Sequence, residues 1–221
     1  MPADALINVN GSNVQTLEIL FFTTLLMLLP SLVVLMTCFT RYVVVFSFLR
    51  SAMGTQTPPN MVLVGMALVL TLFAMAPTLD RVKMEAYDPL VAEEIGQEEF
   101  FQRAQEPLKA FMLRQTGDAS IELYCNMAQI DPPQSEAELQ ALPMRVVLPA
   151  FVTTELKTAF EIGFLLYIPF MLIDMIVAST LMSMGMVMLP PSMIATPFKL
   201  LLFILLDGWQ LLFSTLIQGI K

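Results

Sequence analysis

Hydrophobic residues gather into long runs that polar stretches separate. Residues 17–49 form the first run and 61–79 the second, and two more follow within 146–221, after a polar region at 80–145. Runs of this length can cross the hydrocarbon core of a bilayer, about 30 Å thick, as helices. We therefore predict an all-α, membrane-associated protein with long kinked apolar helices in two hairpins and a small acidic helical region inserted between them.

The first run is longer than one membrane crossing requires. As a single helix its 33 residues would extend about 50 Å, so we expect either a kink at Pro30 or a helix that does not lie wholly in lipid. A turn-rich stretch at 51–60, SAMGTQTPPN, leads into the second run. Residues 17–79 are expected to form the first hairpin. The polar segment before it, residues 1–16, lacks the basic region of a secretory signal.

The second hairpin, residues 146–221, contains a methionine-rich turn. Three methionines fall on one stripe of the predicted helix: Met171, Met175 and Met182. Four then alternate, which places them on one face only where the backbone is extended: Met182, Met184, Met186 and Met188. Gly185 permits a break in the helix, and Pro190-Pro191 disfavours its continuation. We predict a methionine-lined loop and a return helix from about Ile194, which continues as a final helix over 198–220.

The chemistry of methionine leaves two interpretations of this loop open. The side chain is long, unbranched and polarisable, so it fills irregular gaps between packed membrane helices. A ring of such side chains from several subunits would also seal a hole of irregular shape and yield to whatever passes through it.

Composition supports a membrane protein and excludes several other classes. The 221 residues are 57% hydrophobic, with a mean hydropathy of +0.73, which is too apolar for a typical soluble domain. The formal charge is −8, and residues 80–145 carry thirteen Asp/Glu against six Lys/Arg. Such an insert repels phosphate, so we expect no nucleic-acid partner. Amphipathic stretches at 91–115, interrupted by Pro107, and at 119–130 predict a helical cap that leans on its neighbours.

Candidate catalytic chemistry is scarce. The chain has no histidine, which excludes a Ser-His-Asp triad and histidine metal ligands, and it has neither a phosphate-binding GxxxxGK[ST] loop nor an HExxH motif. Cys38 and Cys125 are too different in setting to predict a disulfide. Asp174 and Asp207 lack the Gly-x-Gly-Asp context of an intramembrane aspartic protease, whereas buried carboxylates are typical of proton pathways. We therefore predict no enzyme, no cofactor and no bound metal.

Several charged residues interrupt the apolar runs. An arginine as deep as Arg41 needs a carboxylate or backbone partner, because an unpaired charge in lipid costs several kcal/mol. Arg50, half a turn away in phase, suits a position at the membrane interface. Lys157 and Glu161 are spaced to pair along one helix. The full set of candidate buried or assembly charges is Arg41, Arg50, Glu155, Lys157, Glu161, Asp174, Lys199 and Asp207.

Ordered motifs run along nearly the whole chain from residue 17. They are FTR at 39–41, LRSAMGT at 49–55, PPN at 58–60, PAFVTTELKTAFEIGF at 149–164, GMVMLPP at 185–191, PFKL at 197–200 and DGWQL at 207–211. Together they resemble the FliP/SctR family of export-gate proteins in flagellar and virulence type III secretion.

The resemblance implies a gate subunit. Family members assemble as several copies, about five, with FliQ and FliR, and FlhB is a further candidate partner. The resulting cone admits unfolded flagellar proteins at the bacterial inner membrane, in the flagellar basal body and in contact with membrane lipid. The family's Gly-Met-Met-Met loop corresponds to Gly185, Met186, Val187 and Met188, so valine replaces one methionine here, and Met184 lies beside it. The resemblance favours the seal over gap filling, with the charged set holding subunits together.

Two other classes of function stay open from the residues alone. A stand-alone proton-coupled transporter or ion channel would depend on Asp174. A purely structural scaffold would have no lumen and would leak under no substitution.

Overall fold

A computed structural model describes residues 6–9, 12–15, 20, 23–24, 27, 31, 34–186 and 188–220. Helices dominate it, as predicted, and two of them are long and apolar enough to cross a membrane, Asn60–Val91 and Met144–Ser183. Within the polar N-terminal segment, β1 (Leu6–Val9) and β2 (Ser12–Gln15) form a small antiparallel hairpin that the sequence pattern did not indicate.

The first hairpin contains α2 (Phe39–Met53) and α3 (Asn60–Val82). A bend and turn at Thr37 and Cys38 precede α2, so the run at 17–49 is not one continuous helix; the expected kink at Pro30 falls outside the described residues. Gly54 ends α2 with a left-handed φ of 70°, which glycine adopts without steric cost.

The helix of the second apolar run continues well past residue 79, where the run itself ends. From α3 the chain passes through a π-helical turn, η1 (Lys83–Tyr87), into the short α4 (Asp88–Val91). The insert then forms α5 (Gln97–Gln115), α6 (Asp118–Met127) and α7 (Glu136–Ala141). Both predicted amphipathic stretches are thus helical over most of their length, the first from Gln97 onward. The predicted interruption at Pro107 is wrong, since α5 continues through it, because a proline can bend a helix without ending it.

The second hairpin is built from α8 (Met144–Ser183), α9 (Pro191–Leu205) and α10 (Gly208–Gln218). The 40-residue α8 continues through Pro149 and Pro169. The prediction of one final helix over 198–220 is wrong, since α9 and α10 meet at a 62° bend. Asp207 there has a left-handed φ of 47°, and a Cβ on Gly208 would lie 2.3 Å from the ring of Phe203.

Helix α2 lies at the centre of the packed helices and contacts α8 along much of its length. Gly163 of α8 allows a close approach to α2, because a Cβ there would lie 2.6 Å from the Phe48 side chain. The most deeply buried large side chains include Tyr42, Phe46, Leu49, Phe111, Phe151 and Leu216.

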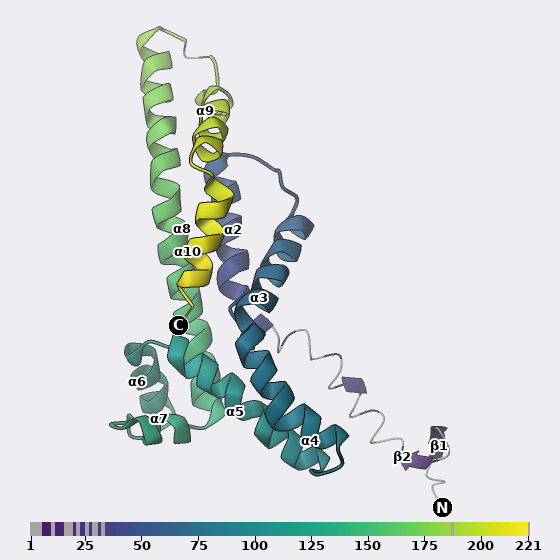
Figure 1. The fold of residues 1–221 in the computed structure, drawn as a ribbon. Coiled ribbons are helices and arrows are strands. Elements are labelled where there is room, and N and C mark those ends of the chain that lie inside the picture. Colours follow the sequence, from purple (N-terminus) through teal and green to yellow (C-terminus); the bar gives the residue numbers. More distant parts are fainter. Residues whose placement is uncertain are drawn as a thin grey trace, which may run out of the picture.

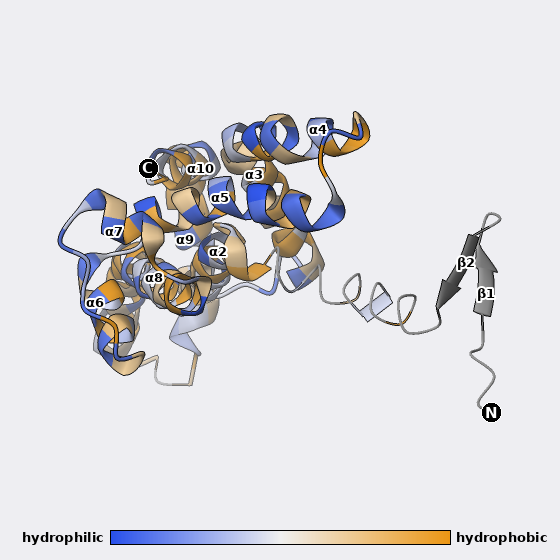
Figure 2. Ribbon diagram, turned by 90° about the horizontal axis from the view of Figure 1, so that it is seen from below, coloured by the Kyte–Doolittle hydropathy of each residue, from blue (hydrophilic) through white to orange (hydrophobic). Residues whose placement is uncertain are grey.

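The insert and the α8–α9 turn lie at opposite ends of α8 (Figure 1). The insert docks on α8 through the ring pair Phe111–Phe151, with centroids 6.0 Å apart, and through a 2.9 Å hydrogen bond between the hydroxyls of Tyr124 and Thr153. Viewed from the insert end, the ribbons of α5, α6 and α7 carry many hydrophilic positions (Figure 2). The helical cap therefore leans on neighbouring helices, as predicted.

Candidate functional site

The methionine loop, which we define as residues 184–190, begins with a glycine-capped helix end. Gly185 has a φ of 74°, its N–H donates to the carbonyl of Met182 (3.0 Å), and the Met186 N–H donates to that of Leu181 (3.0 Å). These are the two hydrogen bonds of a Schellman motif, which satisfies the last carbonyls of a helix. The chain reverses here because Gly185 adopts a conformation that other residues adopt at a cost, and α9 then starts at Pro191, earlier than predicted.

The methionines of this turn are exposed on the single chain. Met188 is 96% exposed and Met186 is 40% exposed, and Val187 falls outside the described residues. The predicted extended backbone is wrong for residues 182–186, since Met182 is helical and Met184 and Gly185 form the turn. The glycine-capped end of α8 turns the chain back on itself, so the alternating methionines do not form an extended strand.

A charged latch joins the two helices that carry the loop. Lys199 of α9 donates to Asp174 Oδ2 of α8 at 2.6 Å and to the carbonyl oxygen of Ala52, near the end of α2, at 2.9 Å. The Lys199 side chain is buried, whereas that of Asp174 is partly exposed, and Asp174 Oδ1 has no hydrogen-bond partner among the described residues. A cation suits this place because the last carbonyls of α2 carry partial negative charge.

A second buried ion pair lies near the insert. Arg41 of α2 donates from Nε and Nη2 to the two carboxylate oxygens of Glu155 of α8. Its remaining donors reach the carbonyl of Gly219 at 3.0 Å and Gln115 Oε1 at 3.4 Å. One guanidinium thus joins α2, α8, the chain after α10, and the last residue of α5, and its fork geometry suits a bidentate contact with carboxylate.

The remaining predicted charges are less buried. Lys157 and Glu161 face each other on α8 at 3.9 Å, with both side chains mostly exposed. Asp207 is exposed at the α9–α10 bend, and Arg50 reaches the side-chain oxygen of Asn60 across the first turn. These residues are therefore not buried charges within the chain, because they lie on outward helix faces or at a helix end. Their expected role between subunits stays a prediction.

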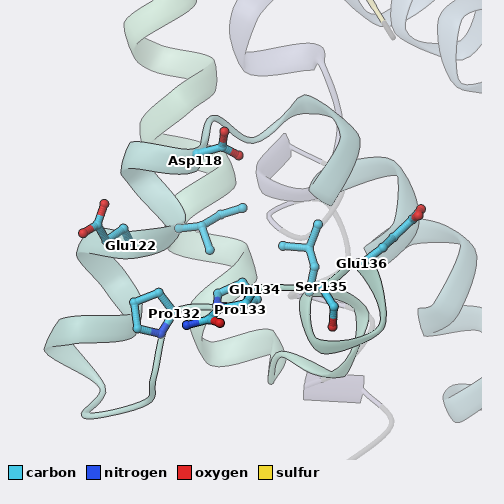
Figure 3. A pocket seen from close by; sticks show the side chains of 9 residues that line it. Asp118, Glu122, Pro132, Pro133, Gln134, Ser135 and Glu136 are labelled. Atoms are coloured by element: carbon cyan, nitrogen blue, oxygen red, sulfur yellow. The ribbon is translucent and has the colours of Figure 1, made fainter.

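The chain has an apolar groove between the helices that carry the methionine loop and a polar-edged pocket in the insert. An apolar groove of about 430 Å³ between α8 and α9 is lined by residues that include Ile176, Leu181 and Phe198. At the insert, a pocket of about 410 Å³ has Asp118 and Glu122 on one side and Ser135 and Glu136 on the other (Figure 3). Within the described ranges, no group of three His, Cys, Asp or Glu residues is placed to hold a metal ion.

Sequence reasoning did not find the partners of the buried charges. The sequence predicts a carboxylate or backbone partner for Arg41, and the structure shows both, Glu155 and the Gly219 carbonyl. Which residues supply them was not predicted, nor were the contacts to Gln115 and to the carbonyl of Ala52. The helical repeat signals none of these contacts, because they join positions far apart in the chain. Cys38 and Cys125 are both buried and unpaired with each other, and burial raises the pKa of the Cys125 thiol.

Comparison with known proteins gives consistent matches along the chain. A sequence model of the FliP family matches residues 22–216. A flagellar biosynthetic protein FliP of Bacillus subtilis strain 168 is 49% identical over 206 residues, covering 93% of this chain and 92% of the relative. The protein of that name from Pectobacterium carotovorum is 52% identical over 213 residues, covering 95% and 81%. The one from Aquifex aeolicus is 48% identical over 210 residues, covering 95% and 87%.

Proposed function

This chain belongs to the FliP family, and from that membership we propose that it is a subunit of the flagellar type III protein export gate. A general role in flagellar biosynthesis follows from the family. In the specific role that we propose, several copies form a channel that admits unfolded flagellar proteins across the bacterial inner membrane, and the methionine loop closes this channel.

One observation carries the proposal: a long helix that is apolar enough to cross a membrane is exposed along most of its length on the single chain. Only 11% of the most apolar stretch of α8 is buried within the chain, and Met188 at its end is 96% exposed. Exposed apolar surface of this extent requires lipid or further subunits to cover it. A loop at the tip of a hairpin can meet its copies around an axis, where Met186, Val187 and Met188 would narrow a lumen.

Within this assembly the charged residues have two roles. Arg41–Glu155 and Asp174–Lys199 hold the fold of each subunit, because their partners come from the same chain. Arg50, Lys157, Glu161 and Asp207 remain available for other subunits, which we propose to be further copies of this chain, about five in total, together with FliQ, FliR and FlhB. The subunit is a passive part of the channel in the basal body, and the energy for transport comes from other components.

The experiment that tests the proposal is the native mass of the protein purified gently in detergent, alone and after co-expression with FliQ and FliR. The expected result is a large, defined assembly that takes up both partners. The control is a variant in which the exposed α8 residues Phe164 and Leu165 are replaced by aspartate, which should lower the assembled fraction by disrupting an apolar contact surface.

A monomer or dimer that is indifferent to both partners would contradict the gate. Proton flux through vesicles containing this chain alone would then test the transporter alternative, in which Asp174→Asn abolishes the flux. A defined assembly that never leaks under substitution of the loop would instead support the scaffold.

A further inference from the structure

The α8–α9 turn concentrates sulfur at one accessible place. Five of the chain's eighteen methionines fall within residues 182–193. Besides Met186 and Met188, the other three are between 66% and 70% exposed: Met182, Met184 and Met193. By contrast, Met75 and Met112 in the core are at most 1% exposed. The same side chain thus occurs in two extreme environments within one molecule.

We propose that the methionine loop is a site of reversible oxidation by hydroperoxides, and that its conversion to sulfoxides opens the seal. The first half of this inference rests only on exposure and chemistry, and the second half rests on the proposed function. The loop sulfurs would then make the gate responsive to oxidants, a regulation that a leucine-lined seal would lack.

The chemical step requires only a peroxide. The thioether sulfur attacks one oxygen of hydrogen peroxide, the O–O bond breaks, an S–O bond forms, and proton transfer releases water. Sulfur is oxidised by two electrons and the peroxide is reduced by two. The product is a polar, chiral sulfoxide, which methionine sulfoxide reductases convert back to the thioether.

The consequence for a seal follows from polarity. Thioethers are only weak hydrogen-bond acceptors and exclude water by contact with one another. A sulfoxide oxygen is a stronger acceptor, so an oxidised tip attracts water into the constriction that its apolar form keeps dry. Several methionines per subunit, repeated in each copy, make the change larger than oxidation of one isolated residue.

The chain contains its own comparison sites. Met61, Met84 and Met127 are at least 61% exposed, but they lie on α3, η1 and α6, away from the α8–α9 turn. They should also oxidise, without affecting the seal. Exposure alone therefore predicts which methionines react, and position predicts which of them matter.

The first part of the test measures the chemistry. The full chain, purified in detergent, is treated with hydrogen peroxide, and the sulfoxide at each methionine is followed over time by peptide mass spectrometry. We expect Met188 to oxidise at least about tenfold faster than Met112, and reductase treatment to reverse the change. Equal rates at Met188 and Met112, in protein shown to be folded, would overturn the inference.

The second part measures the seal, as solute leak through the assembled complex before and after peroxide. Wild type should leak after treatment, whereas the variant M184L/M186L/M188L should stay closed, because leucine keeps the tip apolar and cannot be oxidised. The matched control M61L/M127L should leak like wild type. A complex that stays closed although its loop is shown to be oxidised would overturn the proposed effect on the seal.

This failure is distinguishable from failure of the gate itself. Alanine at Met186 and Met188 should cause a leak without any peroxide if the loop closes a lumen. A leak from the alanine variant but none from the oxidised wild type would reject regulation by oxidation and keep the gate. No leak from either would reject the gate, and with it the effect of oxidation on a seal.

Discussion

Arg41 and Glu155, 114 positions apart in the chain, face each other in the core through two hydrogen bonds, 2.9 Å from Nε to Oε2 and 2.5 Å from Nη2 to Oε1. Both side chains are almost completely buried. The pair connects the two central helices where the insert joins them. Its importance lies less in the attraction itself than in the cost of leaving either charge alone.

We therefore expect Glu155→Ala to lower the free energy of unfolding by about 3–5 kcal/mol, because it strands the Arg41 guanidinium in the core. Denaturant unfolding in a mild detergent, followed by tryptophan fluorescence, measures the change. Lys157→Ala, two positions further along α8, is the matched control. Since Lys157 and its partner Glu161 are mostly exposed, its effect should stay within about 0.5 kcal/mol.

The same pair of variants separates folding from assembly. If Lys157→Ala leaves unfolding unchanged but lowers the yield of the complex, Lys157 contacts another subunit. A stability loss from Lys157→Ala as large as that from Glu155→Ala would contradict the assignment of the buried charge to Arg41–Glu155.

The latch between Lys199 and Asp174 should be energetically coupled. Replacement of either residue leaves the charge of its partner without a counter-ion at a partly or fully buried place. The double variant Lys199→Met/Asp174→Leu should therefore lower the free energy of unfolding by less than the sum of the two single variants. A double-mutant cycle measured by thermal unfolding should give a coupling of about 1–3 kcal/mol. Additive effects would mean that the two side chains do not stabilise each other.

Gly163 and Gly65 offer a matched pair of helical glycines. A methyl group at Gly163 would press on the Phe48 side chain, whereas one at Gly65 would meet no atom within 4 Å. We expect Gly163→Ala to destabilise by about 1–3 kcal/mol through overpacking, and Gly65→Ala to be neutral or to stabilise by up to about 1 kcal/mol. Thermal unfolding checks both, and Phe48→Leu should partly rescue Gly163→Ala but not change the effect of Gly65→Ala.

The thiols should react slowly while the protein is folded. Cys38 and Cys125 have no exposed surface, and burial raises the pKa of Cys125, so at pH 8.5 its thiolate fraction is below that of a free thiol. Because its pKa is raised, loss of the Cys125 proton costs more free energy in the folded protein than in the unfolded chain. The free energy of unfolding should therefore fall as the pH rises above about 9. Labelling by N-ethylmaleimide at pH 8.5, native against denatured, measures the protection. Rapid native labelling of Cys125 would contradict its burial.

The sequence predicted the elements whose signals are local. The two long apolar helices follow from runs of hydrophobic residues, and the turn after α8 follows from Gly185 and Pro190-Pro191. The insert helices α5 and α6 follow from their amphipathic repeat. These features depend on neighbours in the chain, which a pattern records.

Other features depend on contacts between distant residues, which no pattern records. The α9–α10 bend relies on Asp207 in a left-handed conformation and on Phe203 filling the space beside Gly208, yet its sequence continues an apolar run. Likewise, Arg41 required a partner, but helical phase could not select Glu155 over the other carboxylates. Lys157 and Asp207 are candidates for buried or assembly charges from their apolar surroundings, and both are exposed on the single chain, because an apolar run also covers the outward face of a helix.

The last prediction concerns the seal. Met186→Ala combined with Met188→Ala shortens two side chains that would close the lumen. Cells carrying this variant should therefore leak small solutes while the complex still assembles. Met61→Ala combined with Met127→Ala is the matched control, since it removes two exposed methionines that lie on α3 and α6, away from the loop. Uptake of a normally excluded dye, with the mass of the complex checked in parallel, measures the effect. Normal assembly without a leak would show that methionine in this loop fills space between helices and closes no channel.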